Sequence, residues 1–420
     1  MRTEALRRKT RALAGLRRRE PLTALRDAAA RRGQEVWIVG GAIRDAILGI
    51  PPAEIDVAVS GDAEALAREL ESAGRGRAVF LSRDRPGPRV YRVAGRRPVD
   101  LAEIEGGSIE ADLARRDFTV NAVALPLDGG AVRDPFGGLE DLALRRLRCV
   151  REENLREDPL RTLRAARFLA THGLVPDRAT FDAVRQAAPG LAGVAPERIA
   201  AEMSRLLASP RAAPALRWAA GAGLLPAALG LALSPARAAS LARSLAILDD
   251  PATRRLSEDR RRQVRLAWVA LRLGLSEAET RRWLQERRWS RRETDAAARL
   301  TTLAATAGAT AARSDAWRWI LAAGPLASDG AHLAVRLGAA ARRRAPRLSR
   351  LAKAPRRRVA VTGADVMGWL ALPPGPAVGA LLAELEVAAA SGIVKNRREA
   401  RHWLSVQVRN GLSPAIIHAH

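Results

Sequence analysis

The first third of the chain alternates short apolar runs with amphipathic stretches. A helical pattern over 22–32 leads into the apolar run Val36–Val39, and Gly40-Gly41 separate that run from a segment with helical periodicity, 42–48. The same two periodicities predict a further helix at 63–72 and further strands at 55–59, 78–81, 89–93, 99–104 and 122–127. Strands and helices interleaved in this way predict a mixed α/β unit of roughly 120 residues.

The pattern changes after Asp134, because almost only helical periodicity follows Gly138. Helices are predicted at 158–171, 176–188, 196–207 and 213–221, and in a long series to about 341. Segment 341–358 carries nine basic residues and two prolines, which favours a linker. The predicted fold is α+β, a mixed-sheet head followed by an elongated all-α body and tail. Its divisions are a basic helical segment (1–33), the head (34–148), a helical neck (149–210), the body (211–340), the linker (341–358) and a helical tail module (359–420).

The charge balance points to a polyanionic partner. Lys and Arg number 71 against 45 Asp and Glu, a formal net charge of +26, and the only lysines are Lys9, Lys353 and Lys395. Guanidinium groups match phosphate oxygens in a two-pronged geometry, and each neutralised phosphate releases counterions. The alternative is that a GC-rich genome favours Arg and Ala, so charge by itself names no function.

Several classes of protein are excluded by what the sequence lacks. The single cysteine, Cys149, rules out an internal disulfide framework and a multi-cysteine zinc site. The five histidines are scattered, with no HExxH spacing and no His-Asp pair of the phosphohydrolase kind. The N-terminus has no apolar core, and the longest uncharged apolar stretch, 219–236, is interrupted by Gly and Pro. We therefore expect a cytoplasmic protein without a membrane partner.

The strand, Gly-Gly turn and helix at 36–48 predict a phosphate cradle. Backbone N–H groups at a helix N-terminus and the positive end of the helix dipole face the same point, and Arg44 lies one turn further on. A Gly-Gly turn can also serve tight packing alone. Position strengthens the functional interpretation, because Glu54 and Asp56 follow at the start of the next strand.

Glu54 and Asp56 alternate along that strand, so their carboxylates share one face. Two like charges this close are costly unless a cation lies between them, which favours a hard cation such as Mg²⁺. A phosphate cradle beside such a pair implies phosphoryl or nucleotidyl transfer. Asp100 is the best candidate for a third carboxylate, although a strand-end turn residue is an equal alternative; Glu103 lies on the opposite face of its strand.

These residues belong to motifs that resemble a known family. VGGAIRDAILG (39–49) with EIDVAV (54–59) resembles the nucleotidyltransferase signature of the class II tRNA CCA-adding enzymes and bacterial poly(A) polymerases. Similar motifs follow in order: RRDFTVNA (115–122), DPFGGLED (134–141), EDPLRTLRAARF (157–168), PERIAAE (196–202) and PPGPAVG (373–379). The resemblance implies a polymerase beta-like head and a nucleotidyltransferase that uses Mg²⁺, ATP and CTP and binds the tRNA acceptor arm.

The resemblance also implies roles for single residues. Catalytic roles fall to Glu54, Asp56 and Asp100, with Glu54 and Asp56 as the metal ligands. The nucleotide-binding residues are Gly40, Gly41, Arg44, Asp45, Arg115, Arg116, Asp117, Asn121, Glu157, Asp158, Arg161 and Arg164. Arg164 and Arg167 could instead be helix-surface charges or phosphate contacts, and RRD seen alone would suggest a surface salt-bridge cluster.

Asp158 and Arg161 are the most informative of these residues. On a helix beginning at Glu157 they would share one face. A carboxylate accepts from an exocyclic amino group and a guanidinium donates to a ring nitrogen, so the pair fits cytosine and adenine but not uracil or guanine. Glu157 would orient Arg161.

One departure from the family pattern concerns the metal site, where Glu54 stands in place of the usual Asp. The expected activity is addition of C and/or A to the tRNA 3′ end without a nucleic-acid template. Poly(A) polymerase is the enzymatic alternative, although segment 78–92 lacks the histidine usual in that branch. A non-catalytic RNA-binding protein is the alternative of another class.

Overall fold

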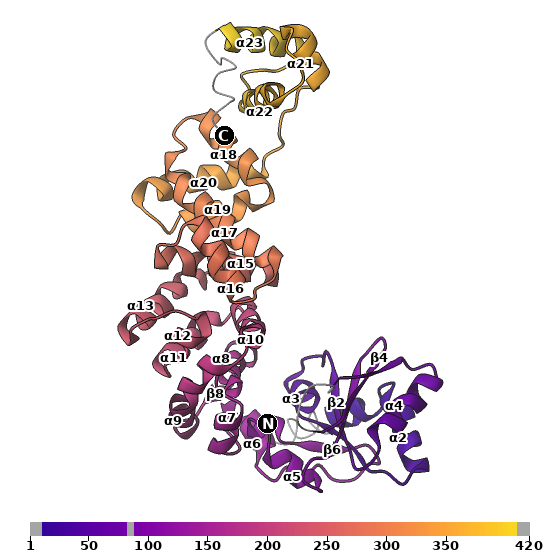
Figure 1. Ribbon diagram of the computed structural model, residues 1–420. Helices are drawn as coiled ribbons and strands as arrows, with labels where there is room; N and C mark the ends of the chain where they lie inside the picture. Colours follow the sequence, from indigo (N-terminus) through magenta and orange to yellow (C-terminus); the bar gives the residue numbers. More distant parts are fainter. Residues whose placement is uncertain (1–10, 82–87, 410–420) are drawn as a thin grey trace. The chain divides into compact units, whose positions relative to one another are not determined.

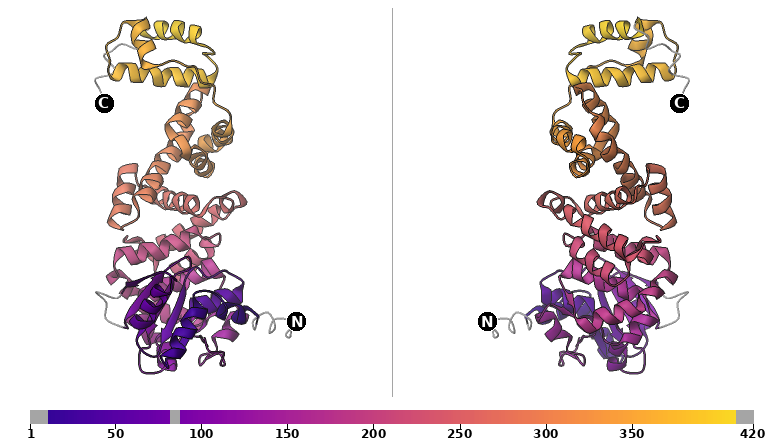
Figure 2. Two further views of the ribbon diagram at one scale, coloured as in Figure 1. Left: turned by 90° about the vertical axis from the view of Figure 1, so that its right-hand side faces the viewer. Right: turned by 90° about the vertical axis from the view of Figure 1, so that its left-hand side faces the viewer.

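The computed structural model describes residues 11–81 and 88–409 of the 420-residue chain. Contacts divide the chain into two compact units, Met1–Asp249 and Asp250–His420, and each is described by itself. The first unit contains the predicted mixed sheet, and the described part of the second contains helices only (Figures 1 and 2). The α+β architecture expected from the periodicities is therefore confirmed. No helix in the described ranges has the length and apolar character needed to cross a membrane.

A six-stranded sheet forms the centre of the head, with the strand order β3-β4-β5-β2-β1-β6. β2 and β5 run parallel, and the other neighbouring pairs are antiparallel. The strands are β1 (Val36–Val39), β2 (Ile55–Val59), β3 (Arg77–Phe80), β4 (Val90–Ala94), β5 (Val99–Glu103) and β6 (Ala124–Pro126). The predicted strands are all present, with ends shifted by at most two residues where they differ.

Alternation along β2 explains which residues the head buries. Ile55, Val57 and Val59 enter the larger core, where α2 (Leu22–Arg31) and α4 (Ala63–Ser72) lie side by side against the sheet (Figure 1). Asp56 and Ala58 point to the other face, where α5 (Ile109–Ala114) packs. Asp56 therefore lies on the face that the larger core does not cover.

The strand directions bring the chemically important residues to one end of the sheet. Val39 at the end of β1 pairs with Asp56 near the start of β2, and Asp56 pairs with Asp100 near the start of β5. Arg92 on β4 is the next partner in this row, opposite Asp100. Residues paired across neighbouring strands share a face, so Asp56, Asp100 and Arg92 lie in a row.

Helices and two short strands complete the first unit. α10 (Pro196–Ala208) and α11 (Ala212–Gly221) begin and end within one residue of predicted helices, as does α3 (Gly41–Leu48). The other elements of this unit are η1 (Thr119–Asn121), α6 (Gly138–Ala143), β7 (Arg146–Leu147), α7 (Glu152–Glu157), α8 (Leu160–His172), β8 (Val175–Pro176), α9 (Arg178–Ala187), η2 (Ala188–Gly193), α12 (Leu225–Leu229), α13 (Pro235–Leu245) and η3 (Ala246–Leu248).

The second unit corrects the prediction of a linker at 341–358. α20 (Ala339–Lys353) covers most of that segment, and only its last residues, 354–358, lie outside a helix. Ala341, Ala345 and Leu348 follow the spacing of one helix face and are buried, so this stripe anchors a helix in spite of its basic residues and Pro346. The other elements are α14 (Pro251–Arg254), α15 (Glu258–Leu273), α16 (Glu277–Glu286), α17 (Arg291–Thr306), η4 (Ala307–Ala309), α18 (Arg313–Ala323), η5 (Gly324–Leu326), α19 (Ala327–Ala334), α21 (Gly363–Leu370), α22 (Pro376–Ser391) and α23 (Arg397–Arg409).

Candidate active site

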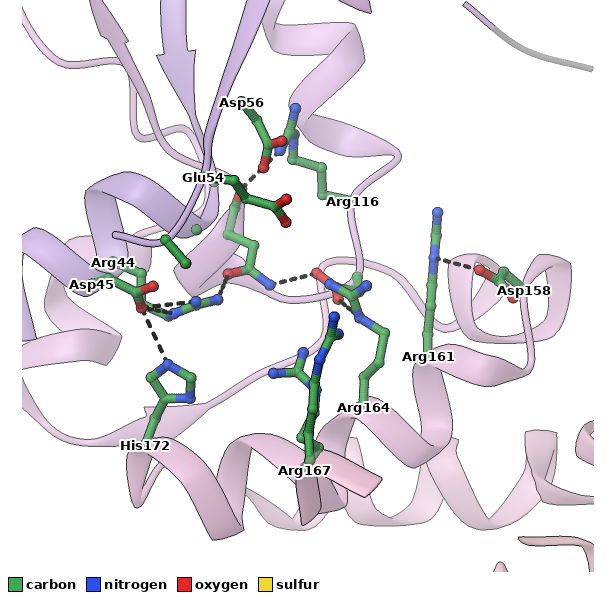
Figure 3. Close-up of a pocket in the computed structure, with 16 residues that line it drawn as sticks. Arg44, Asp45, Glu54, Asp56, Arg116, Asp158, Arg161, Arg164, Arg167 and His172 are labelled. Carbon is green, nitrogen blue, oxygen red and sulfur yellow. Dashed lines mark hydrogen bonds and ion pairs between the residues drawn. The ribbon is translucent and has the colours of Figure 1, made fainter. Parts of the chain in front are cut away.

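A cavity of about 520 Å³ in the first unit gathers most of the predicted site residues (Figure 3). It lies between the end of the sheet that carries Asp56 and helices α8 and α10. Its lining consists of Gly40, Gly41, Arg44, Asp45, Ala53, Glu54, Asp56, Arg116, Asp117, Asn121, Asp158, Arg161, Arg164, Arg167, His172 and Arg205. Asp56 comes from β2 and Glu54 lies directly before that strand, whereas Arg161, Arg164 and Arg167 come from α8. An anion bound here would meet arginines opposite the acidic pair.

The Gly40-Gly41 turn forms the predicted cradle at the N-terminus of α3. Gly40 has φ 66°, a conformation that favours glycine, and a Cβ there would lie 2.7 Å from Arg116 Nη1. Any larger residue would therefore displace a guanidinium of the pocket. The first N–H groups of α3 have no partner within the helix and no side-chain cap, and Gly40 and Gly41 line the cavity, so this helix end is available to an anion.

Arg44 and Asp45, both on α3, are fixed by contacts to other elements. Arg44 donates from Nη1 to Asn121 Oδ1 at 2.6 Å and from Nε to Asp45 Oδ1 at 2.8 Å. His172 Nε2, at the end of α8, lies 3.1 Å from the same Asp45 oxygen. Burial would raise the Asp45 pKa, but the His172 hydrogen bond and the Arg44 charge outweigh it and lower that pKa. Asp45 is thus an ionised link between α3 and α8.

The negative charge of the acidic pair is only partly compensated, by Arg92 beside Glu54 and by Arg116 near Asp56. Burial raises the pKa of Asp56 to about 6; the Arg116 charge opposes this shift, while the charges of Glu54 and Asp100 add to it. A cation would relieve the repulsion, and carboxylate oxygens are the ligands that a hard divalent cation prefers. The donor set therefore fits such an ion, with Glu54 and Asp56 as its holders.

Asp100 does not join this pair as a free third ligand. Arg92 binds both of its oxygens, Nε to Oδ1 at 2.7 Å and Nη2 to Oδ2 at 2.7 Å, and Arg92 Nη2 also lies 3.2 Å from Glu54 Oε2. Asp100 is absent from the cavity lining, and no group of three or more His, Cys, Asp or Glu in the described ranges could hold a metal ion. The sequence placed Asp100 correctly in the row of strands but could not reveal Arg92, whose bond depends on strand pairing.

The RRD segment divides its side chains between the cavity and the surface. Arg115 points away, pairing with Glu105 at 2.7 Å, and only its carbonyl takes part by accepting from Arg161. Arg116 lines the cavity and reaches the Asn121 carbonyl at 3.5 Å. Arg115 is absent from the cavity lining in this structure, and the nucleotide contact predicted for its side chain stays a prediction.

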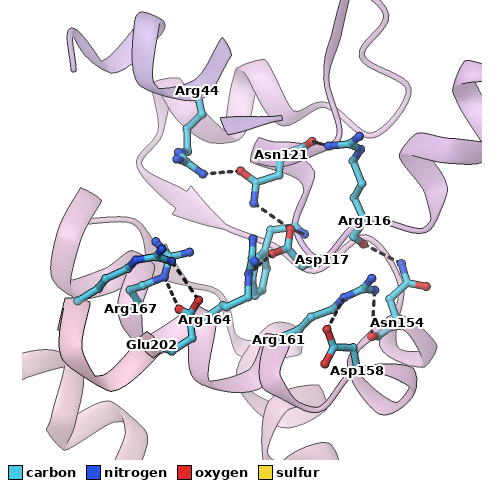
Figure 4. A network of polar contacts seen from close by, with 12 residues as sticks. Arg44, Arg116, Asp117, Asn121, Asn154, Asp158, Arg161, Arg164, Arg167 and Glu202 are labelled. Atoms are coloured by element: carbon cyan, nitrogen blue, oxygen red, sulfur yellow. Dashed lines mark hydrogen bonds and ion pairs between the residues drawn. The ribbon is translucent and has the colours of Figure 1, made fainter. Parts of the chain in front are cut away.

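Asp117 is the buried centre of the polar network in Figure 4. It accepts from the Phe118 N–H and from Asn121 Nδ2, each at 2.8 Å, and lies 2.8 Å from Arg164 Nε as an ion pair. Burial would raise its pKa, but the Arg164 charge and these hydrogen bonds lower it. Asp117 consequently holds Arg164 and Asn121 in place at the wall of the cavity.

Asp158 and Arg161 meet in a different way from that predicted. Asp158 is not in α8. It caps the end of α7 in an extended conformation, φ −129°, because Pro159 disfavours the helical region for the residue before it. Arg161 donates from Nη1 to the Arg115 and Asn154 carbonyls at 2.9 and 3.1 Å, and its Nε lies 3.9 Å from Asp158 Oδ2. Both side chains still face the cavity (Figure 3).

Glu157 does not contact Arg161, which it was predicted to orient. Its side chain is exposed at the end of α7 and absent from the cavity lining, and Arg161 takes its hydrogen bonds elsewhere. The side chain that fixes Asp158 is instead Arg198 of α10, which donates from Nη2 to both Asp158 oxygens at 3.2 and 3.0 Å.

The sequence left Arg167 open between a helix-surface charge and a phosphate contact, and it did not point to His172 or Arg205. Arg167 pairs with buried Glu202 at 2.5 Å, and burial lowers the Arg167 pKa to about 10. The guanidinium carbons of Arg44 and Arg167 lie 4.8 and 4.1 Å from the Phe168 ring centre. His172 and Arg205 also line the cavity. Arg205 lies on α10, and no sequence signal separates it from an ordinary surface arginine.

Two families of known domains match the first unit. Residues 36–148 match the description "Poly A polymerase head domain" and residues 173–229 match "Probable RNA and SrmB- binding site of polymerase A". Among curated proteins, the CC-adding tRNA nucleotidyltransferase of Geobacter sulfurreducens is 33% identical over 92% of this chain and 95% of its own length. The A-adding tRNA nucleotidyltransferase of Deinococcus radiodurans is 42% identical over 50% of this chain and 46% of its own.

Solved structures agree over nearly the whole chain. The Bacillus stearothermophilus CCA-adding enzyme in complex with CTP superposes with a TM-score of 0.71 at 27% identity, covering 93% of this chain and 98% of that one. The Thermotoga maritima CCA-adding enzyme complexed with tRNA gives a TM-score of 0.72 at 20% identity, a likeness of fold, over 95% and 98% of the two chains. With a relative 33% identical over 92% of this chain, the Gly-Gly turn before α3, the acidic pair and the segment 157–168 have a common explanation: this chain belongs to the class II tRNA nucleotidyltransferase family.

Proposed function

We propose that this protein is a tRNA nucleotidyltransferase that adds C and/or A to the tRNA 3′ end from CTP and ATP, without a nucleic-acid template. The observation that carries the proposal is the content of one cavity. The α3 N-terminus at Gly40-Gly41, the acidic pair Glu54 and Asp56, and the Asp158/Arg161 pair all line it. A triphosphate, a divalent cation and a base edge each have a suitable place there.

The finer roles follow from the contacts of each residue. Glu54 and Asp56 would hold the cation, which we propose to be Mg²⁺; when bound, such an ion neutralises charge on a triphosphate and polarises its phosphorus–oxygen bonds. Gly41, Arg44 and Arg116 would bind the triphosphate through backbone N–H groups and guanidinium groups. Asn121 and Asp117 orient Arg44 and Arg164 through the bonds in Figure 4.

Base choice would come from Asp158 and Arg161. Both carbonyl bonds of Arg161 use Nη1, which leaves the Nη2 hydrogens for a ring nitrogen of the base. Arg198 fixes the Asp158 carboxylate, which can still accept from an exocyclic amino group through its remaining lone pairs. Cytosine and adenine present the matching pattern, whereas uracil and guanine present carbonyl beside N–H.

The reaction takes place where tRNA, CTP and ATP meet, so we place the protein in the cytoplasm. Its single Cys149, a free thiol, suits that reducing compartment.

The decisive experiment supplies three tRNAs, lacking CCA, lacking its last two nucleotides and lacking only the final A, each with Mg²⁺ and one labelled nucleotide. The relative matched end to end is named CC-adding, so CTP on the tRNA without CCA is the first combination to test. Absence of CTP and ATP incorporation on all three would refute the proposal. A long homopolymeric A tail on unrelated RNA would identify a poly(A) polymerase, and binding without turnover would identify a non-catalytic RNA-binding protein.

A further inference from the structure

A second cavity of about 500 Å³ in the first unit has no part in the function derived above. It is lined by Glu20, Pro21, Gly74, Arg75, Gly76, Gly95, Arg96 and Arg97. These residues belong to the chain before α2, the turn between α4 and β3, and the hairpin between β4 and β5. We refer to it as the Arg75/Arg97 cavity.

Two glycine-containing turns build this cavity by pressing backbone against backbone. A Cβ on Gly76, which has φ 143°, would lie 2.7 Å from the Ala94 carbonyl oxygen. A Cβ on Gly95 would lie 2.5 Å from the Arg75 carbonyl oxygen. Only glycine permits both approaches without a backbone shift, so the arginines beside these glycines are held close together.

Few acidic groups offset the positive charges of the cavity's arginines. Arg96 and Arg97 are exposed and have no acidic partner in the described ranges. Arg75 has one weak partner, Glu20, at 3.8 Å, and both of these side chains are about half exposed. Glu20 is the one acidic residue of the lining, so the cavity carries an excess of positive charge.

The cavity lies at the same end of the sheet as the acidic pair. The Pro98 carbonyl, directly after Arg97, accepts from the Ile55 N–H at 3.3 Å, and Asp100 follows two residues later. At about 3.3 Å per residue along a strand and about 5 Å between strands, the arginine turns lie roughly 10–20 Å from Asp56. This separation corresponds to a few nucleotides of an RNA strand.

We propose that the Arg75/Arg97 cavity binds backbone phosphates of the tRNA while its 3′ end occupies the catalytic cavity. The inference rests on the proposed function and extends it by a second contact surface. Guanidinium groups bind phosphate oxygens through two bonds at once, and such contacts position a nucleic acid without reading its sequence. The nucleotide substrate is a poor occupant, because this lining contains no aromatic ring or amide side chain for a base.

The test combines Arg96→Gln with Arg97→Gln and measures binding of CCA-less tRNA by fluorescence anisotropy between 50 and 200 mM KCl. Two lost phosphate contacts should weaken binding at low salt about tenfold and reduce the slope of log Kd against log salt by about 1 to 2. The KM for CTP should stay unchanged. Arg26→Gln with Arg68→Gln, exposed residues of α2 and α4 in the same unit, removes equal charge and should leave the slope unchanged.

Glu20→Gln is a variant expected to change tRNA binding in the opposite direction. It removes the acidic group beside Arg75, so tRNA binding should become tighter at low salt. Equal effects of the cavity pair and the control pair, or an unchanged slope in the cavity pair, would overturn the inference. A rise in the KM for CTP instead would show that the cavity serves the nucleotide. If the unmodified protein incorporates neither CTP nor ATP, the proposed function is refuted separately. The binding experiment still tests the cavity, since it does not depend on turnover.

Discussion

Asp56 combines a predicted catalytic role with a measurable cost to the fold. Burial and the neighbouring carboxylates raise its pKa from 3.8 to about 6 in the folded protein. An acid that binds its proton more tightly when folded destabilises the fold while ionised, and a shift of this size corresponds to about 2–3 kcal/mol. The Asp56→Asn substitution removes the charge and keeps the shape of the side chain. We therefore expect it to abolish nucleotide incorporation and to stabilise the metal-free protein.

The pH dependence fixes the sign of this effect. The penalty is fully present well above pH 6, falls as the pH drops through about 6, and is absent below 3.8, where the residue is protonated in both states. The stability difference between Asp56→Asn and the unmodified protein should therefore shrink to about half between pH 7.5 and pH 5.

Thermal unfolding in EDTA measures this difference. For a unit of this size, about 2–3 kcal/mol corresponds to a rise in Tm of about 5–10 °C at pH 7.5. Added Mg²⁺ should raise the Tm of the unmodified protein but not that of the variant. Asp100→Asn is the matched control of opposite sign, because it breaks the bidentate pair with Arg92 and should lower stability by about 1 kcal/mol. A Tm of Asp56→Asn at or below the unmodified value in EDTA at pH 7.5 refutes the reasoning.

Three further substitutions test separate parts of the site. Arg161→Ala should relax CTP/UTP discrimination at least tenfold, with less effect on triphosphate binding, because the base loses its guanidinium donor; unchanged discrimination contradicts this role. Arg92→Leu removes a cation 3.2 Å from Glu54 and should tighten Mn²⁺ binding about fivefold, whereas Arg92→Lys should leave it unchanged. Electron paramagnetic resonance measures the bound Mn²⁺. His172→Leu should raise the KM for CTP about threefold to tenfold by releasing Asp45; a similar rise in His172→Gln, which keeps a donor, argues against that hydrogen bond.

Local periodicity predicted most of the head but failed where long-range packing or one proline decided the conformation. Strands at 36–39 and 55–59 follow from uninterrupted apolar runs beside turn residues, and the structure has them at those positions. The start of α8 was misplaced, since Pro159 holds Asp158 in an extended conformation. The linker prediction over 341–353 gave weight to basic residues and prolines, whereas three buried apolar positions on one face were enough for a helix.

By itself, the sequence determined the chemistry of the cavity. The Gly-Gly turn before a helix and the alternating carboxylates are local features, whose geometry follows from covalent structure and from helix and strand periods. Tertiary structure alone decided which charges compensate one another. Arg92 lies beside Asp100 through strand pairing, Arg198 reaches Asp158 from α10, and Arg115 turns out to Glu105. Contacts between residues distant in sequence depend on strand register and helix packing. No single segment of the chain determines either of these by itself.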